Sequence, residues 1–226
     1  GEGMNTQRKL ADHRIQATLK VLSRFRQICR ENGTPPLFAV ATSAVREASN
    51  GEEFVGLAKK ETGVDIKIIP WEEEARLTLE GVFWKLPHEN KKTITLDIGG
   101  GSTEFILSEG KNIKGFCSTS LGVVRLTEKF ITRHPVDEKE FLNLQNHLES
   151  ELQVVKNKLS AFSPERLIGT AGTVTTLAAL KDNVFPYDPE KIHGTALSRE
   201  ETESILDDLK GKSLNQRLLL KPLERG

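Results

Sequence analysis

Hydrophobic residues near the start of the chain recur with a helical period. Between residues 7 and 30 they follow one another mostly at three- and four-residue steps and form one apolar stripe: Leu10, Ile15, Leu19, Leu22, Phe25 and Ile28. Asn32-Gly33 and Pro35-Pro36 then interrupt the pattern with residues that end helices. We therefore predict one long helix over residues 7–30.

The rest of the first half alternates short apolar runs with amphipathic segments. Residues 37–41 and 64–69 have the pattern of strands. Asn50, followed three residues later by Glu53, resembles a capping box and predicts a helix through Lys60, which Gly63 ends. A further helix is predicted from Glu72 to about residue 85.

The second half begins with strand patterns in direct succession, at residues 93–97, 103–107 and 112–117, which predicts a β-meander rather than a βαβ unit. Helices are predicted at about 123–132, 137–159 and from Gly172 onward, with a strand at 166–169. Ser198 and Glu201 form a second capping-box pattern, for a helix to about residue 209. We expect two α/β lobes, residues 1–92 and 93–226, joined by a polar connector near residues 88–93.

Composition excludes several classes of protein. Lys+Arg and Asp+Glu both number 32, so the chain has no basic excess of the kind that nucleic-acid or anionic-membrane binding usually requires. No apolar run approaches the ~20 residues of a membrane span, and the first residues do not resemble a signal peptide, so a cytoplasmic protein is expected. Cys29, Cys117 and the five histidines have no metal-ligand spacing, which argues against a zinc site.

The strongest chemical signal follows the strand at 93–97: Asp97-Ile98-Gly99-Gly100-Gly101-Ser102-Thr103-Glu104. Three glycines allow positive φ angles and a close approach of the backbone to a ligand, and successive N–H groups in such a turn can bind an anion. The two flanking acids could hold Mg²⁺ directly or through water. The competing interpretation, an ordinary hairpin turn, needs one or two glycines rather than three.

A second candidate motif, Gly169-Thr170-Ala171-Gly172-Thr173, joins a predicted strand to a predicted helix. The N–H groups at such a helix start can face an anion. Small residues are also common in ordinary strand-to-helix turns. The motif becomes informative only in combination with the glycine-rich segment.

Six segments, in this order, resemble the exopolyphosphatase / guanosine pentaphosphate phosphohydrolase family, a branch of the actin-like ATPase superfamily. They are Ala41-Thr42-Ser43-Ala44-Val45-Arg46-Glu47-Ala48, Glu73-Glu74-Ala75-Arg76-Leu77, the segment 97–104, Ser120-Leu121-Gly122-Val123-Val124-Arg125-Leu126, the segment 169–173 and His193-Gly194. The resemblance implies an actin-like (ribonuclease-H-like) α/β fold of two lobes with a cleft between them.

The resemblance also implies chemistry. The family uses Mg²⁺ to cleave terminal phosphoryl groups from polyphosphate or guanosine pentaphosphate, and its members often pair as homodimers. Glu74 resembles the general base, with Glu73 as the competing assignment, and Arg46 resembles the residue that contacts the transferring phosphoryl group. Asp97 and Glu104 resemble the metal-binding acids. The expected phosphate-binding residues are Gly99, Gly100, Gly101, Ser102, Thr103, Gly169, Thr170, Gly172 and Thr173.

Other interpretations stay open at this point. Without the resemblance, Arg46 could be a surface helix residue, and the acids at 72–74 could simply complement a helix dipole. The family normally has a further phosphate loop before its first long helix, so the first lobe is expected to be incomplete at its N-terminus. The alternatives to a hydrolase are therefore a non-catalytic fragment that binds polyphosphate or guanosine penta- and tetraphosphate, and an actin-like ATPase or kinase.

Overall fold

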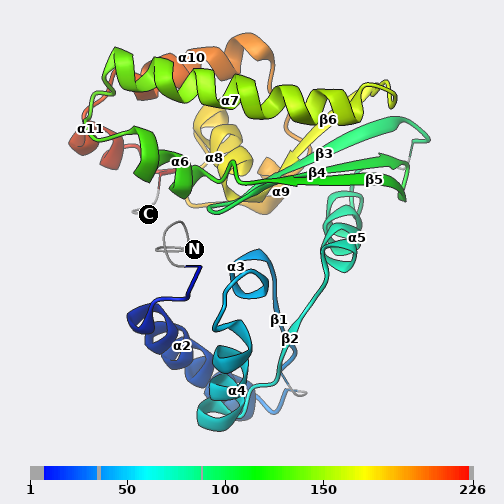
Figure 1. The fold of residues 1–226 in the computed structure, drawn as a ribbon, viewed down its shortest axis with the longest axis vertical. Coiled ribbons are helices and arrows are strands. Elements are labelled where there is room, and N and C mark those ends of the chain that lie inside the picture. The colour runs from blue at the N-terminus through cyan, green and yellow to red at the C-terminus, as the bar shows by residue number, and fades with distance from the viewer. Residues whose placement is uncertain (1–7, 35–36, 88, 224–226) are drawn as a thin grey trace. The chain divides into compact units, whose positions relative to one another are not determined.

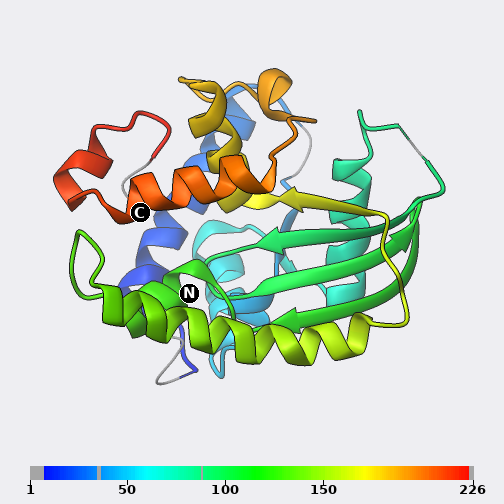
Figure 2. The same ribbon diagram turned by 90° about the horizontal axis from the view of Figure 1, so that it is seen from above.

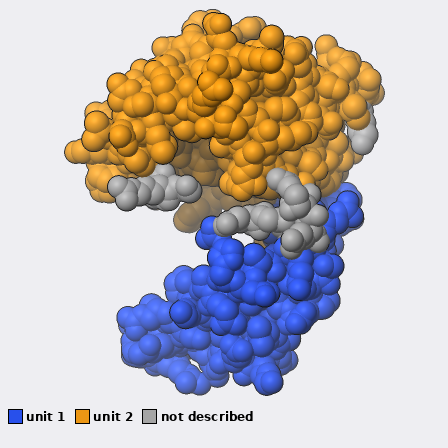
Figure 3. All heavy atoms as spheres, turned by 60° about the vertical axis from the view of Figure 1, so that its left-hand side comes forward, with its two compact units in different colours: residues 1–76 blue, residues 77–226 orange. Residues whose placement is uncertain are grey.

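The computed structural model describes residues 8–34, 37–87 and 89–223. The chain divides into two compact units, Gly1–Arg76 and Leu77–Gly226, each of which is described by itself (Figure 3). The division falls within a helix, earlier than the expected connector near residues 88–93. Phe83 and Lys85, which follow α5, belong to the second unit and contact the guanidinium of Arg166 and the carboxylate of Glu190 there. The expected domain limits themselves stay a prediction.

The first unit alternates helices and short strands (Figure 1). Its elements are α2 (Asp12–Glu31), β1 (Ala39–Ala41), α3 (Ser43–Arg46), α4 (Gly51–Thr62), β2 (Ile66–Ile68) and the start of α5 (Trp71–Val82). β1 and β2 pair in parallel, with Val40 opposite Lys67. Leu19 of α2 and Phe54 of α4 are buried in the core that the helices share with the two strands. The predicted helices and strands of this half are present, but the predicted start of the first helix is wrong: residues 8–11 are not helical and α2 begins at Asp12, while residue 7 lies outside the described part. The short α3 was not predicted.

The predicted capping box at the start of α4 is wrong. Asn50 is the N-cap residue, but its side chain makes no capping bond. Instead, its amide accepts a hydrogen bond from the Leu10 N–H at 2.8 Å and donates one to the Leu10 carbonyl at 3.1 Å. The buried Asn50 thus fixes the segment before α2 to the start of α4. The predicted end of α4 is confirmed, because Gly63 has φ 67° in the left-handed region.

The second unit contains a four-stranded sheet of order β5-β4-β3-β6. β3 (Lys92–Ile98), β4 (Thr103–Glu109) and β5 (Asn112–Thr119) form the predicted antiparallel meander, and β6 (Arg166–Thr170) pairs in parallel with β3. The helices are α6 (Val123–Phe130), α7 (Glu138–Leu159), α8 (Ala171–Asp182), α9 (Pro189–Ile192), α10 (Arg199–Lys210) and α11 (Leu214–Leu218). Among the described helices of this unit, the short α9 and α11 were not predicted.

The two faces of this sheet have different partners. On one face, Phe105 and Cys117 pack against Val155 of α7, which runs along the sheet in Figures 1 and 2. The other face carries the buried hydroxyls of Thr93, Thr95 and Ser108. None of the helices in the described ranges combines the length and the apolar character that a membrane span requires.

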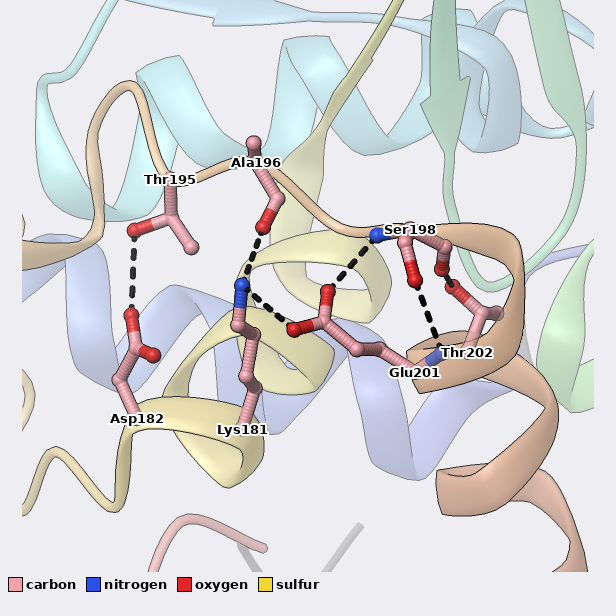
Figure 4. A network of polar contacts seen from close by, with 7 residues as sticks. All are labelled: Lys181, Asp182, Thr195, Ala196, Ser198, Glu201 and Thr202. Carbon is pink, nitrogen blue, oxygen red and sulfur yellow. Dashed lines mark hydrogen bonds and ion pairs between the residues drawn. The ribbon is translucent and has the colours of Figure 1, made fainter.

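A polar network joins the end of α8 to the start of α10 (Figure 4). Lys181 Nζ donates to the Ala196 carbonyl at 2.6 Å and pairs with Glu201 at 3.0 Å. Glu201 also accepts the Ser198 N–H, and the Ser198 hydroxyl accepts the Glu201 N–H, so the capping box predicted for α10 is confirmed. The Ser198 N–H first, and Lys181 second, hold the pKa of Glu201 below its ordinary value.

Candidate functional site

The glycine turn, residues 99–102, connects the carboxyl end of β3 to the start of β4. The two acids that flank it are direct partners in the antiparallel ladder, Asp97 opposite Glu104. Directly opposite residues in such a pair share a face of the sheet, with Cβ atoms ~5 Å apart. The predicted pair of carboxylates is therefore brought together, although seven positions separate the two residues along the chain.

These acids belong to a polar row that crosses all four strands. Ser118 of β5 lies opposite Glu104, and Thr170 of β6 lies opposite Asp97. Ser118 Oγ donates to Glu104 Oε1 at 3.0 Å, and the Glu104 side chain is buried. A buried carboxylate needs such partners. The row places hydroxyl and carboxylate groups side by side at one edge of the sheet, the edge formed by the carboxyl ends of β3 and β6.

The second motif lies directly beside the glycine turn. Gly169 pairs with Leu96 and Thr170 with Asp97, so β6 ends next to the end of β3. Thr173, in the first turn of α8, donates its hydroxyl to the Ile98 carbonyl at 3.0 Å. The two motifs that the sequence predicted separately thus form one edge of the sheet. The Thr173 hydroxyl is bound within the chain, and so is that of Thr103, which donates to the Leu121 carbonyl at 2.8 Å.

The expectation of positive φ angles in the glycine turn is wrong. Gly99, Gly100 and Gly101 are all described, and none of them has φ in the left-handed region. The close approach that requires a glycine lies instead at Gly122, which packs against the backbone of the turn. A Cβ on Gly122 would lie 2.2 Å from the Gly101 carbonyl carbon and 2.4 Å from the Gly100 oxygen. Sequence reasoning missed Gly122 as a site residue, since only the three-dimensional contact distinguishes it from other glycines.

The left-handed backbone occurs in the second motif, at a residue that is not glycine. Ala171 has φ 65°, which costs an L-residue roughly 1 kcal/mol or more. It follows the extended Thr170 and opens α8. The left-handed conformation of Ala171 turns the chain sharply from β6 into the helix. The predicted start of the helix near Gly172 is confirmed within one residue.

The other candidate residues lie in the first unit, and two of them are in contact. Arg46 is the last residue of α3, and Glu74 lies in the first turn of α5. Arg46 Nη1 donates to Glu74 Oε2 at 3.0 Å and to the Ile69 carbonyl at 2.8 Å. The two side chains are 26% and 24% exposed, so the ion pair is only partly solvated. Arg46 is therefore held by α5 rather than extended freely from the surface.

Glu73, the competing assignment for the base, has a different partner. Arg76 donates from Nε to Glu73 Oε2 at 3.0 Å and from Nη2 to Glu73 Oε1 at 2.8 Å. This bidentate hydrogen bonding is the main reason that the pKa of Glu73 is lowered. Both oxygens of Glu73 are thus engaged, whereas the Arg46 bond occupies one oxygen of Glu74.

The residues of the polar row fit Mg²⁺ better than a metal that needs a complete protein cage. Within the described ranges, no group of three or more His, Cys, Asp or Glu side chains could hold a metal ion. Mg²⁺ is commonly bound through one or two carboxylates, together with water and substrate phosphates. Asp97 and Glu104, as neighbours on one face of the sheet, supply that number of carboxylates.

A family model matches the whole chain: the Ppx/GppA phosphatase family, over residues 1–226. The chain belongs to this family. A solved exopolyphosphatase structure from Cytophaga hutchinsonii is similar with a TM-score of 0.88 and 28% identity, over 99% of this chain and 72% of that one. The mixed α/β fold expected from the sequence is thereby confirmed as the fold of this family.

Curated Ppx/GppA relatives differ in how much of their length the chain spans. A bifunctional 3-dehydroquinate synthase/phosphatase of Fusobacterium nucleatum is 32% identical over 91% of this chain, which covers 32% of that protein. Exopolyphosphatase 2 of Mycobacterium tuberculosis is 26% identical over 100% of this chain, which covers 72% of that protein. The chain thus spans about a third of the first relative and under three quarters of the second.

Proposed function

We propose that this Ppx/GppA chain is the core of a Mg²⁺-dependent hydrolase that releases the terminal phosphate of inorganic polyphosphate or guanosine pentaphosphate. The observation that carries the proposal is the polar row: Asp97 stands between Glu104 and Thr170, directly beside the glycine turn. Carboxylates for a cation and backbone N–H groups for a phosphate are thus within one edge of the sheet. A cytoplasmic location and a homodimer are part of the same proposal.

Phosphoryl transfer to water needs positioning and charge neutralisation more than covalent help. Asp97 and Glu104 would hold Mg²⁺, which, when bound, offsets the negative charge of the substrate phosphates. In this proposal the N–H groups of the glycine turn and of residues 169–173 bind phosphate oxygens. Arg46 contacts the transferring phosphoryl group, for which a guanidinium fork is well suited.

Glu74 is the residue we assign as general base. It accepts a proton from the attacking water while the water oxygen forms a bond to the terminal phosphorus and the bridging oxygen leaves with the rest of the substrate. Glu74 is the better choice than Glu73 because Arg76 engages both oxygens of Glu73 and lowers its pKa. A carboxylate of lowered pKa is a weaker proton acceptor.

The test is phosphate release from polyphosphate and from guanosine pentaphosphate, with the complete protein and Mg²⁺. We expect release from at least one substrate, loss of release in EDTA, and recovery when Mg²⁺ is added back. Asp97→Asn should raise the Mg²⁺ concentration needed for half-maximal rate, whereas Glu109→Gln, at the opposite end of the same hairpin, should not. Folded protein that releases phosphate from neither substrate would rule the proposal out.

The same assays separate the two alternatives. A non-catalytic fragment would bind polyphosphate or the guanosine phosphates in calorimetry without releasing phosphate from them. An actin-like ATPase or kinase would turn over ATP faster than it hydrolyses either proposed substrate. Either result would replace the hydrolase assignment while leaving the family membership in place.

A further inference from the structure

Helix α6 begins against the glycine turn and uses its first N–H groups there. The Val123 N–H donates to the Gly99 carbonyl at 3.0 Å. The N–H groups of Val124 and Arg125 both donate to the Gly100 carbonyl, at 3.0 and 3.3 Å. The N–H groups at a helix start have no partner within their own helix, and here the glycine turn supplies two acceptors for three of them.

Peptide geometry then fixes where the turn's own N–H groups point. In a trans peptide the N–H and the C=O of one unit point in opposite directions. The unit whose oxygen is the Gly99 carbonyl carries the Gly100 N–H, and the next unit, with the Gly100 carbonyl, carries the Gly101 N–H. Because both carbonyls point toward α6, both N–H groups point away from it. Among the described residues, neither N–H has an acceptor.

Gly122 determines how closely α6 can approach. It is the N-cap residue, with φ −81° and ψ 142°, values that any residue adopts. The glycine is required by space instead, since a Cβ would lie 2.2 Å from the Gly101 carbonyl carbon and 2.4 Å from the Gly101 nitrogen. Both clashing atoms are backbone, so a side chain at position 122 could be accommodated only by displacing the glycine turn or α6.

We propose that α6 is a positioning element for the phosphate site: its first turn holds the Gly99 and Gly100 carbonyls, and thereby directs the Gly100 and Gly101 N–H groups together toward the substrate's terminal phosphate. The inference rests on the proposed function. The positive end of α6 also polarises the two peptide units, because hydrogen bonds in a chain strengthen one another. α6 thus favours an anion that it does not itself touch.

The substitution Val123→Pro isolates the key hydrogen bond. Proline is well tolerated at the first helical position, and the ψ of Gly122 suits a residue before proline. The change removes the N–H that binds the Gly99 carbonyl and leaves the other bonds of α6 in place. Orthophosphate is titrated into the complete, ¹⁵N-glycine-labelled protein without Mg²⁺, and the amide shifts of Gly100 and Gly101 are followed.

We expect both amide signals to respond to phosphate in the wild type. In Val123→Pro the affinity should fall about 3- to 10-fold, the equivalent of one hydrogen bond, and the Gly100 shift should shrink more than the Gly101 shift. A loss of general stability would not select between two neighbouring amides. Arg199→Pro, at the first position of α10, is the matched control and should bind phosphate as the wild type does.

A second variant tests the distance between the start of α6 and the glycine turn. Gly122→Ala should lower kcat/KM about 100-fold, because an ångström-scale shift of the phosphate amides is costly. Gly115→Ala, in β5 of the same sheet, is its control, since a Cβ there would make ordinary contact with Leu107 at 3.7 Å. The inference would be overturned, even in an active enzyme, by either of two results. One is wild-type phosphate affinity in Val123→Pro, and the other is that the Gly100 and Gly101 amide signals do not shift when phosphate is added. Selective weakening at Gly100 in a protein that hydrolyses nothing would support the inference and refute the proposed function.

Discussion

Gly169 gives a sharp test of how the second motif is packed. A Cβ built there would lie 2.5 Å from Cγ1 and 2.9 Å from Cγ2 of Val174, in the first turn of α8. Val174 is β-branched and has essentially one allowed rotamer in a helix, so it cannot turn aside. We expect Gly169→Ala to lower the free energy of unfolding by about 2–3 kcal/mol, the upper part of the range for overpacking.

A double-mutant cycle identifies the cause. Val174→Ala removes both γ-carbons and should cost about 1–2 kcal/mol by itself. In that background the nearest remaining Val174 atom is Cβ at 3.1 Å, so adding Gly169→Ala should cost less than ~1 kcal/mol. The two changes should therefore couple favourably by about 1–2 kcal/mol, well above the ~0.5 kcal/mol within which independent sites add.

The assay is urea unfolding of the four proteins, followed by far-ultraviolet circular dichroism. Gly172→Ala is the control, because a Cβ there would have nothing within 4 Å and alanine favours the helix. It should be neutral or slightly stabilising. Strictly additive losses in the cycle, or an unchanged stability for Gly169→Ala, would refute the argument that contact with Val174 requires this glycine.

Two further predictions concern carboxylates. Glu74→Gln should lower kcat about 10²–10⁴-fold, and Glu73→Gln should leave most activity. With Glu74 as the base, Arg76→Ala should leave the acidic limb of the kcat–pH profile in place. If Glu73 were the base, the loss of Arg76 would raise the pKa of Glu73 and move that limb to higher pH. The Ser198 N–H, and then Lys181, hold the pKa of Glu201 below its ordinary value, so its contribution to stability is present above that ordinary value and is lost as pH falls through the lowered pKa. Urea titrations across this acid range should show a shallower loss for Glu201→Gln, and an unchanged slope would contradict the role of its bond to the Ser198 N–H.

Much of the fold was predictable because it depends on sequence patterns among neighbouring residues. The stripe of α2, the meander of β3–β5 and the capping box at Ser198 each depend on residues within a few positions of one another. The carboxylate pair was also predictable, since Asp97 and Glu104 flank a single turn. Interactions between residues close in sequence are sufficient to form such features, and the structure confirms them.

The remaining features depend on contacts between distant residues. Asn50 had the pattern of a cap, but the backbone of Leu10, 40 positions away, is its partner. The glycine turn was expected to need positive φ, whereas the close approach is at Gly122, where a Cβ would meet the backbone of Gly100 and Gly101. No local pattern reports a close approach of two segments. The catalytic roles of Arg46 and Glu74 stay predictions, although the structure brings the two side chains into contact.

The ladder register between β3 and β4 makes the site sensitive to chain length. Side chains alternate between faces, so one residue inserted between Asp97 and Glu104 would place a residue from the opposite face of the sheet next to Asp97. The pairing of β4 with β5 contains an irregularity at Leu107/Ser108, near the far end of the sheet. We expect an extra residue beyond this irregularity to leave the pairing of Glu104 with Ser118 unchanged. Insertions and deletions among relatives are therefore expected to collect at the Gly110 hairpin, which makes that turn the natural place to attach a label or a fused domain.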